Sequence, residues 1–276
     1  MGVFLGGLSS LFYGVADFLG GEASKKAPAP AVVLGAGMVS FPLISIAALA
    51  IGGQSRPGDW VLGALAGLFG ALGLTTLFAG LARGHAAAVA PASAAFGGVV
   101  PVAVAVMLGE RPSALAWAGV ALAVPSIIMC SWVADRGDLP HGGLGYGLIA
   151  GLGFGGFTII ISRTAPASNL LPLIPARAAT MAAVVVMALF GLWRIEGMRT
   201  LPRGLVAGNG VLDVSANIAL LLALRAGSLA LVAVAASVFP AVTVTLARLV
   251  NHEHLRGRQI LGLVLTLLAL ALIALG

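Results

Sequence analysis

The side chains with the clearest chemical potential are charged residues inside long apolar runs. Asp17, Arg177 and Asp213 each lie among apolar neighbours, where an unpaired charge costs about 2.5–3.5 kcal/mol on bilayer-insertion scales. Arg177 and Asp213 fall at similar depths in consecutive runs, so we expect them to pair. The pair is either purely structural or part of a binding site, in which Arg177 can hold a carboxylate through two parallel hydrogen bonds.

The position of Asp17 in the first apolar run allows two interpretations of its role. A carboxyl group shielded from water can take up a proton, which makes Asp17 a candidate for proton coupling. Alternatively, Asp17 extends toward the nearer water interface and has no chemical role.

Other polar and aromatic side chains in the apolar runs could line a cavity with these charges. The expected substrate-binding set is Tyr13, Ser93, Phe96, Phe157, Arg177, Asp213, Asn217 and Ser237. Asn217 follows Asp213 by four residues, so the two share a helix face. For any one polar member the alternative role is a hydrogen bond between helices.

Three prolines mark where helices could bend. Pro91 and Pro101 lie in one apolar run and Pro240 in the corresponding run of the second half. Interrupted helices at matching positions of two repeats point to a binding site. A simple packing kink is the alternative, so these residues are expected hinge or helix-break positions.

Composition identifies the solvent that surrounds these runs. Of the 276 residues 60% are hydrophobic and 9% are charged, whereas soluble domains carry about 25% charged residues. Because the apolar runs are continuous rather than alternating, they predict helices and not barrel strands. The sequence therefore predicts an all-α membrane protein that crosses the inner membrane many times.

Runs of about 20 apolar residues predict membrane-spanning helices. There are ten such runs, at approximately 2–22, 30–51, 59–82, 86–108, 113–132, 142–162, 170–193, 203–224, 228–249 and 257–275. Odd-numbered loops between them carry ten Lys and Arg residues and even-numbered loops carry four. The positive-inside rule places the odd-numbered loops in the cytoplasm and both termini outside.

The two halves of the chain resemble each other. Arg83 matches Arg225 at an offset of 142 residues, and Glu110 and Gly119 match Glu253 and Gly262 at an offset of 143. Each half holds five expected spans, so the second half enters the membrane from the opposite side. We expect a first five-helix repeat at 1–133, a connecting loop at 134–141 and a second, inverted repeat at 142–276.

Several segments together resemble the EamA family of the drug/metabolite transporter superfamily. They are LARGHAAAVAPASAAF, LGERPSALAWAG, PARAAT, SVFPAVTVTLARL and HEHLRGRQILG. The resemblance covers nearly the whole chain and implies transport of small metabolites, commonly amino acids, without a cofactor.

These observations predict a secondary transporter that exports a small metabolite, with a neutral or aromatic amino acid as the expected substrate, by alternating access. A flippase for a lipid or lipid-linked precursor is the alternative, followed by a membrane-embedded enzyme. The four histidines all fall in loops, the single cysteine leaves no metal-ligand cluster, and no nucleophile motif is present, so we expect no enzyme activity, metal or cofactor. The expected partners are the substrate and membrane lipid, a monomer is compatible with this architecture, and the scattered basic residues give no nucleic-acid surface.

Overall fold

The computed structural model describes residues 1–83, 86–107, 113–131, 141–226, 239–251 and 257–275. Its elements in these residues are α-helices and two short 3₁₀ segments, and none of them is a strand. The first half contributes α1 (Gly2–Ser24), α2 (Ala29–Ile51), α3 (Pro57–Leu81), α4 (Ala86–Met107) and α5 (Ala114–Ser131). The second half contributes α6 (His141–Ser162), η1 (Pro166–Ser168), α7 (Leu173–Leu189), η2 (Met198–Thr200), α8 (Arg203–Ala226), α10 (Phe239–Asn251) and α11 (Gly257–Leu275).

The helices lie where the apolar runs predicted them, with one clear difference. A span was expected over 170–193, but α7 covers only Leu173–Leu189. Gly191 and Gly197 adopt φ values of 69° and 79°, a left-handed conformation that ends a helix and that favours glycine. Residues 190–202 therefore form a folded loop that includes η2. For the expected span at 228–249, only the part from Phe239 lies within the described residues.

Among the described residues, four helices are long and apolar enough to cross a membrane on their own: Ala29–Ile51, Pro57–Leu81, the Gly143–Ser162 part of α6, and Arg203–Ala226. Large apolar side chains cover the outer faces of these helices. Val61, Leu65 and Leu68 on α3 are 45–60% exposed and recur at helical spacing, as expected for a helix that faces lipid. The protein is therefore a multi-pass membrane protein, and ten remains the predicted number of crossings.

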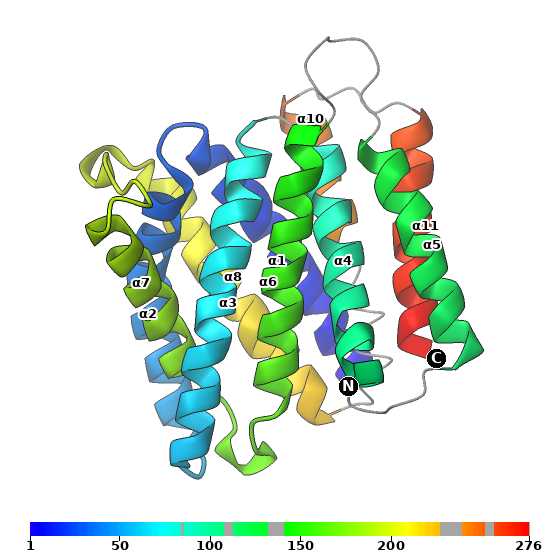
Figure 1. The fold of residues 1–276 in the computed structure, drawn as a ribbon. Helices are drawn as coiled ribbons and strands as arrows, with labels where there is room; N and C mark the ends of the chain where they lie inside the picture. Colours follow the sequence, from blue (N-terminus) through cyan, green and yellow to red (C-terminus); the bar gives the residue numbers. More distant parts are fainter. Residues whose placement is uncertain (84–85, 108–112, 132–140, 227–238, 252–256, 276) are drawn as a thin grey trace.

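Helix packing relates the two halves by a pseudo-two-fold. If α1–α5 correspond in order to α6, α7, α8, α10 and α11, then the main contacts between the two halves occur in matching pairs. Helix α1 packs on α8 as α6 packs on α3, and α4 packs on α6 as α10 packs on α1. The corresponding pairs α2·α7 and α5·α11 pack on each other and form the two ends of the molecule (Figure 1).

The two halves run in opposite directions. In Figure 1 α1 rises from the N-terminus at the lower side, whereas α6 descends from the upper side, and both chain ends lie at the lower side. This arrangement agrees with the inverted repeat that the odd number of spans in each half predicted.

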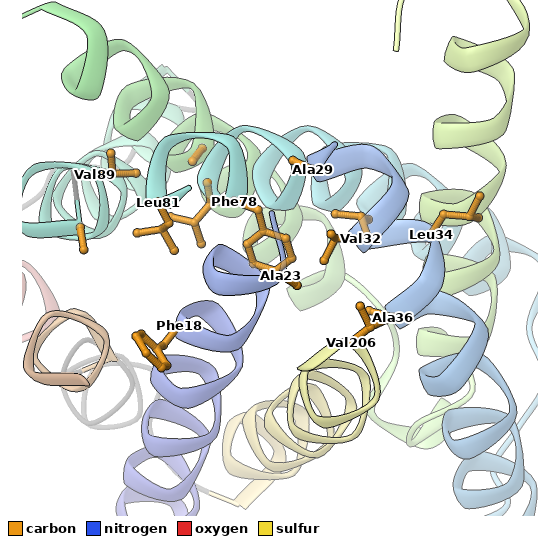
Figure 2. Close-up of a cluster of buried hydrophobic side chains, with 14 of the residues drawn as sticks. Phe18, Ala23, Ala29, Val32, Leu34, Ala36, Phe78, Leu81, Val89 and Val206 are labelled. Carbon is orange, nitrogen blue, oxygen red and sulfur yellow. The ribbon is translucent and has the colours of Figure 1, made fainter. Parts of the chain in front are cut away.

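The apolar core closes around the upper ends of α1 and α3. Phe78 of α3 lies over the end of α1 near Ala23, and Val206 of α8 lies beside Ala36 of α2 (Figure 2). The α7–α8 loop adds Trp193, Ile195, Met198 and Leu201 to the same cluster. The loop that replaces the expected end of span seven therefore helps to close this side of the bundle.

Candidate functional site

Arg177 of α7 and Asp213 of α8 form the predicted ion pair. The two side chains are only 11% and 8% exposed. The attraction between the two charges offsets the cost of removing each of them from water. The pair can therefore exist at this depth, where a lone charge would be costly. The main chain of α7 at this point lies close to α3, since the Thr180 hydroxyl donates to the Gly67 carbonyl oxygen at 2.8 Å.

Helix α1 brings Tyr13 and Asp17 to the same region. They are one helical turn apart and therefore share a face. The Tyr13 hydroxyl lies within electrostatic reach of Asp213, Arg177 and Asp17, and Asp17 lies within reach of Asp213. These four residues come from both repeats, so the charged cluster lies at the seam between them.

Asp17 is 4% exposed. Within the described part of the chain, no hydrogen bond or ion pair reaches its carboxyl group. The neighbouring backbone is fixed by side chains from the second repeat: Asn209 donates to the Ala16 carbonyl oxygen at 2.7 Å, and Thr243 donates to that of Gly14 at 3.1 Å. The scaffold around Asp17 is thus firmly hydrogen-bonded, whereas its own carboxyl group is left available.

Asn217 lies one turn below Asp213 and lines a narrow crevice. Its side-chain amide donates to the Asp213 carbonyl oxygen at 2.8 Å. The crevice is lined by Asn217, Phe157, Ile161, Leu173, Leu220, Leu221 and Leu224. Two members of the expected binding set, Phe157 and Asn217, therefore meet in one apolar space beside the ion pair.

Ser93 and Phe96 lie elsewhere, at the contact between α4 and α6. Ser93 is fully buried, and its hydroxyl donates to the Ala90 carbonyl oxygen at 2.8 Å. A side chain at Gly151 of α6 would meet the Ser93 carbonyl oxygen and the Phe96 Cβ. No contact among the described residues joins Ser93 or Phe96 to the ion pair, so their place in the binding set remains a prediction.

The proline positions are only partly described. Helix α4 continues through Pro91 and Pro101 without ending, so neither proline breaks the helix. Pro240 is the second residue of α10 as described and is buried. Their role as hinges stays a prediction, and Ser237 lies outside the described residues.

Sequence reasoning missed a third buried acid, Asp59, in the first turn of α3. It is 6% exposed. Its carboxylate accepts hydrogen bonds from the Ala165 N–H at 3.1 Å and from the Ser168 hydroxyl. The only signal was its position after Pro57 and Gly58 at a helix start, which reads as an ordinary surface turn.

No group of three or more His, Cys, Asp or Glu side chains within the described ranges could hold a metal ion. The ionisable groups of the seam are one arginine, two carboxyl groups and one phenol. They can bind opposite charges and transfer protons.

The family model of the EamA-like transporter family matches residues 1–132 and 141–275. The chain belongs to the EamA-like transporter family. Like other members of this family, it is a membrane transporter of the drug/metabolite transporter superfamily, and the family comprises transporters rather than enzymes.

A protein of known crystal structure matches this EamA-like transporter over 99% of the present chain and 97% of its own, with a TM-score of 0.62 and 14% sequence identity. At that identity the match shows a shared fold alone. No curated protein matches the chain.

Proposed function

We propose that this transporter is a secondary carrier that exports a small zwitterionic metabolite, a neutral or aromatic amino acid, across the inner membrane by alternating access. The observation that carries the proposal is the charged cluster at the seam. Tyr13 and Asp17 come from the first repeat, and Arg177 and Asp213 come from the second. Relative motion of two inverted repeats around such a site exposes it to either side in turn.

The charges of the cluster match both ends of an amino acid. Arg177 can exchange its contact with Asp213 for the carboxylate of the substrate, because a guanidinium binds a carboxylate in the same geometry. Asp213 and Asp17 are then available for the ammonium group. The crevice beside Asn217 is lined mainly by apolar side chains, which suits an apolar substrate side chain.

Asp17 is proposed as the proton-coupling residue. It is the carboxyl group of the cluster without a partner among the described residues. A buried carboxyl group that is unpaired can bind a proton in one state of the carrier and release it in the other. The exchange of that proton for the substrate ammonium would couple export to the proton gradient.

A thermal-shift screen of the purified protein against the twenty amino acids tests the substrate class. We expect neutral or aromatic amino acids to raise the unfolding midpoint, and Arg177→Lys to abolish the shift because lysine lacks the paired donors. Arg163→Gln is the matched control, since Arg163 is exposed in the α6–α7 loop. Absence of a shift with every amino acid would refute this substrate class.

Uptake into inside-out vesicles then tests transport and its coupling. The amino acid identified in the screen should accumulate when a pH gradient is imposed. Asp17→Asn should transport without responding to that gradient. Full gradient dependence in Asp17→Asn would remove the coupling role from this residue.

A further inference from the structure

A set of hydrogen bonds joins the two repeats at the lower end of the molecule in Figure 1. From the first repeat, the α2–α3 loop supplies Gly52 and Gln54, and the first turn of α3 supplies Asp59. The α6–α7 loop supplies Ala165, Ala167, Ser168 and Asn169 from the second. We call these seven residues the polar latch.

Apart from the bond from the Ser168 N–H to the Ala165 carbonyl oxygen within its own loop, the hydrogen bonds of the polar latch cross between repeats. The Gln54 N–H donates to the Ala167 carbonyl oxygen at 2.8 Å, and the Asn169 side chain donates to that of Gly52 at 3.1 Å. The Ala165 N–H donates to Asp59, and the Ser168 hydroxyl contacts both Asp59 and, at 2.9 Å, the Gln54 carbonyl oxygen. Any motion that separates the repeats at this end must break all of them together.

Arg225 of α8 holds the α6–α7 loop, which is the part of the polar latch that belongs to the second repeat. Its guanidinium donates to the Thr164 carbonyl oxygen and hydroxyl, each at 3.1 Å, and to the Ala165 carbonyl oxygen at 3.2 Å. Arg225 also lies within electrostatic reach of Asp59. The α6–α7 loop is thus held against α8 of its own repeat, and the contact to Asp59 is the part that can open.

The pseudo-equivalent loops at the other end are α1–α2 and α7–α8, and among the described residues no hydrogen bond joins them. There the α7–α8 loop packs on α2 through apolar side chains, with Leu201 beside Gly35. Within the described ranges no hydrogen bond joins this loop to α2. The first turn of α8, which corresponds to that of α3, carries no acidic residue. The polar latch is therefore specific to one side of the membrane.

The crevice beside the ion pair leads toward the polar latch. Along α8 it runs from Asn217, one turn past Asp213, to Leu224, the residue before Arg225. On α6 it reaches Ile161, three residues before Thr164. Separation of the latch would let water reach the ion pair along this path.

We propose that the polar latch is the gate of this transporter on the side of the even-numbered loops. This proposal rests on the proposed function, in which the two repeats move against each other. Water can replace each hydrogen bond of the latch when it opens, so the closed and open states can be close in free energy. Asp59 is the residue that sets the balance, because a charged acceptor makes the strongest of these bonds.

The test measures access to the crevice and uses no transported solute. A single cysteine, Leu220→Cys, is placed in the crevice in a Cys130→Ala background and treated with the membrane-impermeant reagent 2-sulfonatoethyl methanethiosulfonate. A separate Arg56→Cys variant shows which side of the membrane carries the latch. We expect Asp59→Asn to raise the labelling rate of Leu220→Cys from that side about tenfold, which corresponds to the loss of one hydrogen bond to a charged group.

Two further variants keep the outcome decisive. Ser168→Ala should raise the rate in the same direction and decides the result if Asp59→Asn does not fold, as judged by gel filtration. Arg163→Gln, an exposed change in the same loop, should leave the rate unchanged. Three results would overturn the proposal that the latch is a gate. They are unchanged labelling in both latch variants, an equal rise in Arg163→Gln, and a rise only from the opposite side. Because the readout is access, failure of amino-acid transport would leave this result standing.

Discussion

Arg177 and Asp213 show how a charge is tolerated at this depth. Both side chains are largely buried, so the energy of each depends on the presence of the other. The sequence was sufficient to predict this pair, because three charged residues in otherwise apolar runs leave few possible partners.

At this scale we predict that the double change to the pair will cost less stability than either single change. Arg177→Met or Asp213→Leu alone leaves a buried charge unpaired and should lower the free energy of unfolding by about 3–5 kcal/mol. The double variant should recover most of that loss, as measured by thermal unfolding in detergent. If both single variants unfold like the parent protein, the pair is not buried as described.

The same double variant separates the two roles of the pair. A purely structural pair predicts that the stable double variant keeps its thermal response to amino acids. A binding role predicts that the response disappears while the fold remains.

Sequence reasoning could not find the polar latch for a physical reason. Asp59 and Ser168 are 109 residues apart. The sequence around each of them predicts only an ordinary turn exposed to water. Two backbone N–H groups and two side-chain amide or hydroxyl groups supply its donors, and backbone groups carry no sequence signal. Only the juxtaposition of the two loops reveals it.

Helix α6 shows what small residues do at the scale of an element. Gly147, Gly151 and Gly155 form a row of glycines that faces α4, and Gly153 and Gly156 face α3 on the other side. A Cβ atom at Gly153 would lie 2.6 Å from the Gly73 Cα of α3. The two helix backbones approach so closely that no side chain fits between them.

A matched pair of alanine variants tests this contact. Gly153→Ala must push α3 and α6 apart, so we expect a markedly lower unfolding midpoint in detergent. Gly145→Ala on the same helix meets nothing within 4 Å and should unfold like the parent protein. Equal midpoints for the two variants would show that α3 and α6 are not in backbone contact.

Most helix bounds were predictable because lipid demands long, continuous apolar runs. Span seven was wrong at its C-terminal end because Leu192, Trp193 and Ile195 continue the apolar pattern beyond Leu189. The sequence alone does not show that the chain turns here, so that Trp193 and Ile195 pack on a core cluster while Leu192 stays exposed.

The whole molecule has polar loops at two opposite ends, and their basic residues predict its orientation. Arg56 and Arg199 are both exposed and lie in loops at opposite ends. We expect Arg199→Cys to react with the impermeant reagent only in inside-out vesicles and Arg56→Cys only in intact cells, in accord with the positive-inside rule.

Permeabilised membranes provide the control, since both cysteines should then react. Reaction of both from the same side would contradict the helix topology. A complete reversal of the two sides would contradict only the orientation.

The interleaving of the repeats has a consequence for biosynthesis. The principal neighbours of α1 are α8 and α10, so most of its buried face has no protein partner until they are made. Roughly 200 residues separate α1 from α8, and at about 5–20 residues per second their synthesis takes roughly 10–40 s. During that interval Asp17 must stay in the lipid, in the insertion machinery or at the headgroup layer. The nascent first half is therefore the stage at which quality control would recognise a failed molecule.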